Sequence, residues 1–140
     1  MPFREKSAWA MGLILALAGV WYFNKVISVS RALGETAPPI LPFVIAYVVL
    51  VVIASIVVMS VIAGTAGKEA EAPADERETI ILDKAGLWSG YVLALGVFAG
   101  LFHFGVRGDG NLLFHICFAA LMASQVAEYA FQIILYRRGV

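Results

Sequence analysis

Four long apolar stretches occupy most of this 140-residue chain and decide what it can fold into. They run from Ser7 to Phe23, from Ile40 to Ala66, from Ala85 to Val106 and from Leu112 to Tyr136. At about 1.5 Å of rise per residue, a helix of such length can cross a hydrocarbon layer ~30 Å thick. We therefore predict four membrane-spanning helices at about 7–27, 40–66, 76–106 and 111–136, with a cytoplasmic loop at 67–75.

The composition supports this membrane location. Hydrophobic residues make up 61% of the chain and charged residues only 14%, so a water-soluble domain would expose too much apolar surface. Ten basic and ten acidic residues cancel, and no basic patch favours a nucleic-acid partner. We expect no enzyme, because the sequence has no zinc motif, phosphate-binding glycine loop or Ser/His/Asp set. The predicted fold is a single all-α domain over 1–140, a four-helix transmembrane bundle built from two antiparallel hairpins.

Basic residues are divided unevenly between the two predicted membrane sides. The side with the termini and the 67–84 loop carries seven of them, namely Arg4, Lys6, Lys68, Arg77, Lys84, Arg137 and Arg138. The other side carries Lys25, Arg31 and Arg107. The positive-inside rule then places both termini in the cytoplasm. Trp21, Tyr22 and Phe23 end the first apolar stretch, which favours a retained first span over a cleaved signal peptide.

Local signals define the helix ends. Pro38, Pro39 and Pro42 separate the first two spans, and Gly108-Asp109-Gly110 is interpreted only as a tight turn between the last two. Asp75 and Glu78 have the spacing of a capping box, with Asp75 as the N-cap. We therefore predict one continuous helix from about residue 76 to 106, whose first turns project into the cytoplasm.

Small residues recur at helical spacing in the first and third spans. A shift of 78 residues aligns Gly12 with Gly90 and Ala16 with Ala94, and Gly86 lies one turn before Gly90. If this is a parallel internal repeat, spans one and three pack together near an axis along the membrane normal. The alternative is that small residues, with Gly96 and Gly100 among them, only mark helix contacts. We expect self-association through such small-residue faces, as a homodimer or higher homo-oligomer in the lipid bilayer.

Glu128 is the one acidic residue deep inside a predicted span. Gln125 and Gln132 lie three residues before it and four after it, on the same helical stripe. A carboxylate in a membrane is unfavourable by about 2.5–3.5 kcal/mol, so this stripe should face protein. The structural interpretation is interhelical or intersubunit hydrogen bonding, and the functional one is a proton or cation site.

His103 and His115 flank the second exterior turn at similar predicted depth. Two histidines at matched depth could hold a haem iron or part of a metal site. The sequence offers no third ligand nearby, so hydrogen-bonded histidines are the default expectation and we expect no cofactor. The single cysteine, Cys117, is interpreted as a small apolar residue.

Two charged motifs resemble those of an uncharacterised family of small bacterial four-span inner-membrane proteins. The first is Ala72–Glu78 (APADERE) with the following Ile80 and Lys84-Ala85, and the second is the closing Tyr136–Gly139 (YRRG). The resemblance covers nearly the whole chain, including Phe3–Trp9. It implies a protein of the bacterial inner membrane, and the occurrence of such proteins beside small helix-turn-helix regulators implies signalling. It supplies no activity and no catalytic residues.

The leading functional hypothesis is a non-enzymatic membrane protein with an interaction or regulatory role. Its cytoplasmic face would carry that role through Asp75, Glu76, Arg77, Glu78, Lys84, Arg137 and Arg138. These opposite charges could pair with each other or dock a cytoplasmic protein partner. The alternatives are a small proton-coupled transporter or channel that uses Glu128, and a b-type haem or metal-binding membrane protein that uses His103 and His115.

Overall fold

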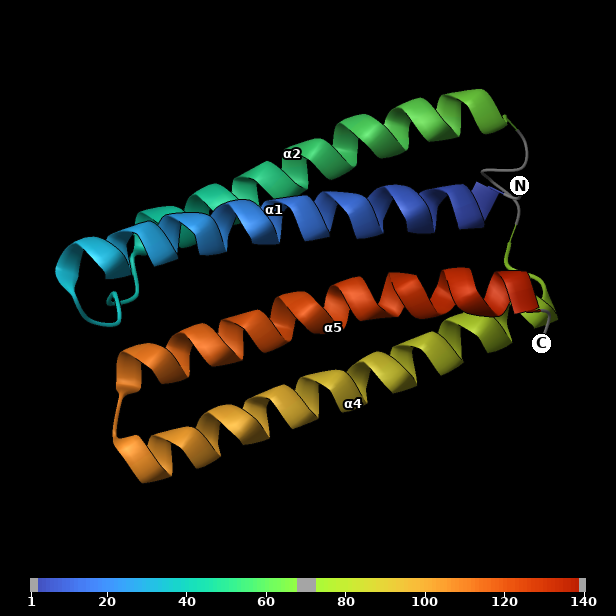
Figure 1. The fold of residues 1–140 in the computed structure, drawn as a ribbon. Coiled ribbons are helices and arrows are strands. Elements are labelled where there is room, and N and C mark those ends of the chain that lie inside the picture. The colour runs from blue at the N-terminus through green and yellow to red at the C-terminus, as the bar shows by residue number, and fades with distance from the viewer. Residues whose placement is uncertain (1–2, 68–72, 139–140) are drawn as a thin grey trace.

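The computed structural model describes residues 3–67 and 73–138, which form four helices joined by short connections. The helices are α1 (Phe3–Leu33), α2 (Leu41–Ala66), α4 (Glu76–Arg107) and α5 (Gly110–Arg138) (Figure 1). Each is long and apolar enough to cross a membrane, which confirms the predicted all-α four-helix architecture. Lys68, Ala72 and most of the predicted 67–75 loop lie outside the described residues, as does Gly139.

Both ends of the described chain lie at the same end of the bundle (Figure 1). This follows from an even number of helices that run alternately up and down. The opposite end carries the α1–α2 connection and the α4–α5 turn. We refer to the end with the termini as cytoplasmic and to the other as exterior, following the predicted topology.

Each helix ends where the local sequence requires it. Asp75 caps α4 in a complete capping box, because its carboxylate accepts from the Glu78 N–H at 2.7 Å while the Glu78 carboxylate accepts from the Asp75 N–H. At the other end of α4, Gly108 adopts a left-handed conformation (φ 70°) and donates its N–H to Phe104. Gly34, with φ 73°, follows α1 in the same way. The predicted capping box and the predicted start of α4 at residue 76 are therefore confirmed.

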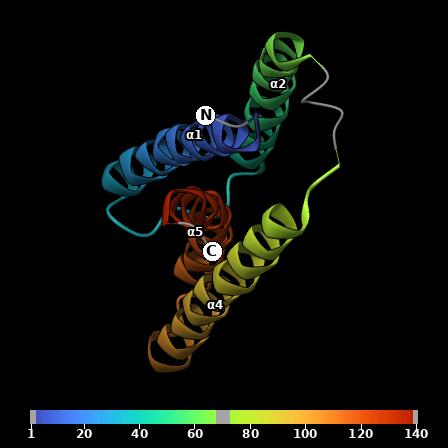
Figure 2. The same cartoon turned by 90° about the vertical axis from the view of Figure 1, so that its right-hand side faces the viewer.

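The four helices pack as an open row in the order α2, α1, α5, α4 (Figures 1 and 2). Substantial contacts join each helix to the next one in this order, and no comparable contact closes the row between α2 and α4 of the described chain. The packing of spans one and three that a parallel internal repeat would give is not found, because α5 lies between α1 and α4. The short connection at 108–109 makes α4 and α5 antiparallel neighbours along their length, and it is α5 of this pair that packs against α1.

Small residues bring α5 close to both of its neighbours. A Cβ on Gly96 would clash with the Cβ of Ala120, and a Cβ on Gly100 would meet Ile116 at 3.1 Å. On the other side of α5, a Cβ on Gly12 would meet the Cβ of Tyr129 at 3.4 Å. The close approach of α5 to α4 therefore depends on the absence of side chains at Gly96 and Gly100.

Buried side chains form one cluster near each end of the bundle. Near the exterior end, Tyr22 is fully buried and packs edge-on against Phe118 and Tyr47, with ring centroids 4.9 and 6.1 Å away. Near the cytoplasmic end, Ile81 and Ala85 of α4 pack against Leu135 of α5. Tyr47 is the one buried residue of α2, whose apolar side chains otherwise lie largely on the surface. A lipid environment is the setting in which such a surface is stable.

The close contact between α4 and α5 gives a direct test with a matched control. We expect Gly96→Ala to destabilise the folded protein by about 1–3 kcal/mol, because the new methyl group forces α4 away from Ala120. Gly86→Ala, on the same helix, meets nothing within 4 Å and should leave stability unchanged or slightly raised. Thermal unfolding in detergent measures both, and equal melting temperatures for the two variants would contradict the described packing.

Candidate functional site

The polar residues of α5 form one stripe that changes from exposed to buried along the helix. Gln125 is exposed near the middle of α5, Glu128 is half-buried, and Gln132 is 6% exposed. The Gln132 Nε2 donates to the Glu128 Oε1 at 3.5 Å, so the structure brings these two predicted residues together. Gln125 lies one turn away on the same stripe with its amide at the surface.

The Gln125–Glu128 part of this stripe lies between the sides of α5 that contact α1 and α4, whereas Gln132 at the cytoplasmic end is covered by the rest of the chain. Helix α5 contacts α4 through Ala120 and contacts α1 through Met122. Because successive residues are about 100° apart around a helix axis, the stripe lies between the α4-facing and the α1-facing sides of α5. Phe118, two helical turns before Gln125, contacts Tyr47 of α2 with ring centroids 5.6 Å apart. The stripe therefore faces the open side of the row, between α2 and α4.

A stripe of small residues on α4 faces the same open side. Gly86, Gly90 and Ala94 are all exposed, and a Cβ on either glycine would meet nothing within 4 Å. Because Gly96 lies opposite Ala120 in an antiparallel pair, Gly90 lies level with Gln125 and Glu128. We name these six residues the open polar face: Gly86, Gly90 and Ala94 of α4 with Gln125, Glu128 and Gln132 of α5. The predicted packing residues thus divide. Gly12, Gly96 and Gly100 lie against α5, and Ala16 lines a cavity between α1 and α5. Gly86 and Gly90 would meet nothing within 4 Å even with a Cβ, and Ala94 is exposed.

The charged residues at the cytoplasmic end pair mainly with each other. Glu78 of α4 accepts from the Arg4 Nε of α1 at 3.0 Å, and Glu5 of α1 accepts from the Arg137 Nε of α5 at 3.4 Å. The Arg137 guanidinium also lies over the Trp9 ring, 5.4 Å from its centroid. These contacts tie the first turns of α1 and α4 to the last turn of α5.

Backbone groups complete this end of the bundle. The Arg77 Nη2 donates to the Tyr136 carbonyl at 3.4 Å, near the open C-terminal end of α5, where a cation is favoured. Glu76, Lys84 and Arg138 remain exposed. Arg4 and Glu5 were not predicted as site residues, although their position one turn from the start of α1 is the signal that could have indicated them.

The exterior end is held by side chains that connect the two exterior loops. The Thr36 hydroxyl donates to the Asp109 Oδ2 at 3.0 Å, and the Asn111 amide donates to the Thr36 carbonyl at 3.4 Å. Asp109 also caps α5, because its Oδ1 accepts from the Leu112 N–H at 2.9 Å. The interpretation of residues 108–110 as only a turn was therefore incomplete: Asp109 also connects the α4–α5 turn to the α1–α2 connection.

The two predicted histidines occupy different surroundings. His115 is buried and donates its Nε2–H to the Ala37 carbonyl at 2.9 Å, with its ring 6.5 Å from that of Tyr22. It thus lies on the α5 side that faces α1 and the 36–40 connection, whereas α4, which carries His103, packs on the Ile116–Ala120 side. An iron shared by the two rings would require His115 to leave Ala37 or to bind through Nδ1. Among the described residues, no group of three or more His, Cys, Asp or Glu could hold a metal ion.

The exterior hydrogen bonds shift the pKa of Asp109. The Leu112 N–H is the main cause and the Thr36 hydroxyl acts in the same direction, so both hold the pKa of this carboxyl below its usual range. A carboxylate with a lowered folded-state pKa stabilises the fold above its unfolded-state pKa of about 3.9. That contribution is lost as the pH falls through the folded-state pKa.

We expect acidification from about pH 7 to about pH 3 to lower the melting temperature less in Asp109→Asn than in the natural chain. The asparagine keeps an oxygen for the Leu112 N–H but carries no titratable charge. Glu35→Gln, at an exposed carboxylate in the neighbouring connection, serves as the control and should retain the natural pH dependence. Identical pH profiles for Asp109→Asn and the natural chain would contradict this role of Asp109.

Comparison with protein-family models, curated proteins and solved structures finds no match for this chain. The family resemblance of the APADERE and YRRG motifs therefore stays a prediction. The four helices, each long and apolar enough to cross a membrane, indicate a multi-pass membrane protein.

Proposed function

We propose that this chain is a non-enzymatic protein of the bacterial inner membrane that self-associates through the open polar face. The observation that carries the proposal is the exposed amide of Gln125 near the middle of α5. Hydrocarbon offers an amide no hydrogen-bond partner, so exposure to lipid there is unfavourable. A second copy of the chain supplies such a partner, because an amide both donates and accepts.

The α4 side of the open polar face suits a close helix contact. Gly86, Gly90 and Ala94 lie level with the polar stripe and leave space where side chains would otherwise stand. Small residues at this spacing let helix backbones approach, and an interhelical hydrogen bond in a membrane adds about 0.6–2 kcal/mol. In this arrangement the small residues of α4 let the helices of two copies lie close together, and Gln125 forms the hydrogen bond between the copies.

The cytoplasmic end supports an interaction role of a more limited kind than its sequence suggested. Glu78 and Arg137 are engaged within the chain, and Asp75 caps α4. Glu76, Lys84 and Arg138 are exposed and make none of these contacts, so a cytoplasmic protein partner would bind first through them. In this proposal self-association in the bilayer is the primary interaction, and it brings two such charged ends together.

The proposal predicts weaker self-association for two variants. Gln125→Leu removes the amide and Gly90→Ile fills the approach surface, and each should raise the dimer dissociation constant in liposomes at least about tenfold, a change of ~1.4 kcal/mol. Gly64→Ile on α2 is the matched control, because a Cβ there also meets nothing within 4 Å. Fluorescence energy transfer between labelled copies, measured at several protein-to-lipid ratios, gives these constants.

Unchanged dissociation constants in both variants would overturn the proposal. The same liposomes test the transport alternative, for which the half-buried Glu128 carboxylate on the open side is the relevant observation. Glu128→Gln keeps hydrogen-bonding capacity but cannot carry a proton. A proton flux present in the natural chain and absent in Glu128→Gln would favour transport, whereas no flux in either favours the interaction role.

A further inference from the structure

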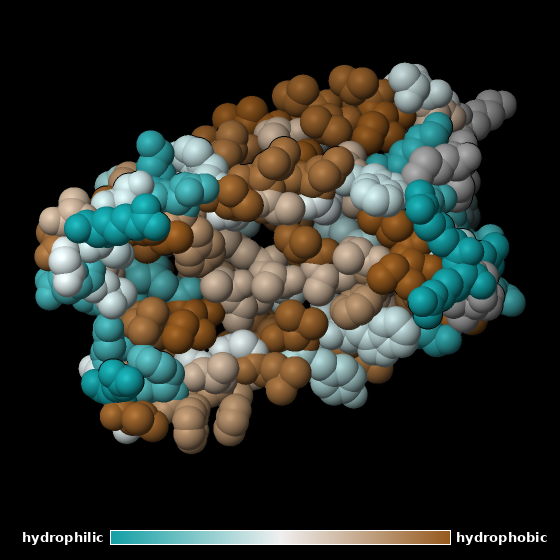
Figure 3. Space-filling model, viewed as in Figure 1, coloured by the Kyte–Doolittle hydropathy of each residue, from teal (hydrophilic) through white to brown (hydrophobic). Residues whose placement is uncertain are grey.

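A long apolar groove follows the contact between α1 and α5 from the exterior end toward the middle of the bundle. Its outer part is a cavity of about 610 Å³ lined mainly by Phe23, Val26, Ile27, Leu112, Ile116 and Ala119. Its inner part is a second cavity of about 460 Å³, which shares Phe23 and Ala119 with the first. The face seen in Figure 3 is hollowed between these two helices. We name the two cavities together the α1–α5 groove.

Small residues keep the α1–α5 groove open. On α5, Ala119, Ala123 and Ala127 follow each other at four-residue spacing along its wall, and on α1 the wall includes Ala16 and Gly19. The α5 residues lie on the side of that helix opposite to the open polar face. The groove is therefore a separate feature, and it runs along the helix axes, which is the direction of lipid chains across a bilayer.

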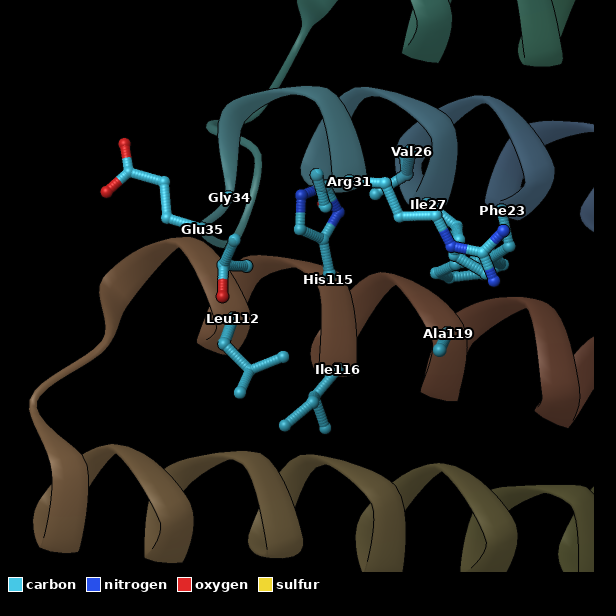
Figure 4. Close-up of a pocket in the computed structure, with 12 residues that line it drawn as sticks. Phe23, Val26, Ile27, Arg31, Gly34, Glu35, Leu112, His115, Ile116 and Ala119 are labelled. Atoms are coloured by element: carbon cyan, nitrogen blue, oxygen red, sulfur yellow. The ribbon is translucent and has the colours of Figure 1, made fainter.

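Arg31 places one positive charge at the exterior part of this groove. Figure 4 shows its side chain running along the groove toward Phe23, while Glu35 points away from it. Within the described residues the Arg31 guanidinium forms no ion pair. Arg31 lies four residues, or about 6 Å, beyond the predicted end of the first span, and its side chain turns back from there along the groove (Figure 4).

The lining defines the chemistry of an occupant. Cavities of about 300–1,000 Å³ with mostly apolar walls and a few polar groups are typical of ligand sites. The apolar length of this one fits an acyl chain, and a guanidinium favours a carboxylate or phosphate that accepts its N–H groups. Ser30 lines the same cavity, and its hydroxyl, which accepts from the Ala37 N–H, keeps its own proton for a further acceptor.

We infer that the α1–α5 groove binds a lipid with an anionic head group, whose acyl chain lies against Phe23, Ile27 and Ala119 and whose carboxylate or phosphate meets Arg31. A free fatty acid and an anionic phospholipid both present this chemistry. The inference does not depend on self-association, because Arg31 and the groove lie away from the open polar face.

Photolabelling in liposomes tests the inference. Three probes carry the same diazirine acyl chain: a fatty acid, a phosphatidylglycerol and an uncharged fatty alcohol. After illumination, peptide mass spectrometry compares labelling of the groove residues with labelling of α2. We expect the anionic probes to label the groove at least about tenfold more than α2, and the stronger of the two identifies the source of the head group.

Two variants test whether the labelling by anionic probes depends on Arg31 and on the groove. Arg31→Gln should reduce anionic labelling of the groove to the level of the alcohol, and Ala119→Phe, which fills the groove, should reduce labelling by all three probes. Arg107→Gln is the matched control, because this other exterior arginine does not line the groove. Equal labelling of groove and α2, or groove labelling that is unchanged in Arg31→Gln, would overturn the inference.

Discussion

The position of α5 between α1 and α4 is the constraint on which the rest of the structure depends. Gly96 of α4 packs closely against Ala120 on one side of α5, and Gly12 of α1 packs closely against Tyr129 on the other side. With both neighbours held closely by the same helix, α2 packs mainly against α1, reaches α5 through the Tyr47–Phe118 contact, and leaves the row open. The two surfaces argued to be functional follow directly, since the open polar face lies on one side of α5 and the α1–α5 groove on the other.

The ends and the middle of the bundle are stabilised by different interactions. At the cytoplasmic end, the pairs Arg4–Glu78 and Glu5–Arg137 join three helices, and at the exterior end Asp109 and His115 join the two connections. Near the middle, packing is almost wholly apolar, as expected where no water competes for or satisfies polar groups. Ser124 there is buried but donates to the Leu121 carbonyl of its own helix, whereas Gln125 is exposed, which is the basis of the proposed self-association.

The sequence predicted the features that depend on neighbouring residues. Span number, the capping box at Asp75 and the turn at Gly108 are all local in origin, because length, cap chemistry and glycine conformation decide them. The order of the helices could not be predicted in this way. Gly90 and Gly96 have the same chemistry, yet only Gly96 meets a neighbour, since apolar helices in lipid carry no pattern that distinguishes a protein-facing side from a lipid-facing one.

In the candidate sites, too, the sequence predicted what depends on neighbouring residues and could not predict what depends on helix packing. The spacing of Gln125, Glu128 and Gln132 predicted their common stripe, but only the packing shows which side it faces. Glu5 and Asp109 were missed because their partners lie 132 and 73 residues away in the chain, at Arg137 and Thr36. The α1–α5 groove could not be predicted either, because it arises from small residues on two helices that have to be placed first.

Cysteine crosslinking in native membranes tests the central position of α5 most directly. In a background with Cys117→Ser, the pairs Gly12→Cys with Tyr129→Cys and Gly96→Cys with Ala120→Cys bring Cβ atoms within reach of a disulfide. The account predicts that both pairs form intramolecular crosslinks on mild oxidation and that Gly12→Cys with Gly90→Cys, which joins α1 to α4, does not. A rapid intramolecular crosslink between positions 12 and 90, with none to α5, would contradict it.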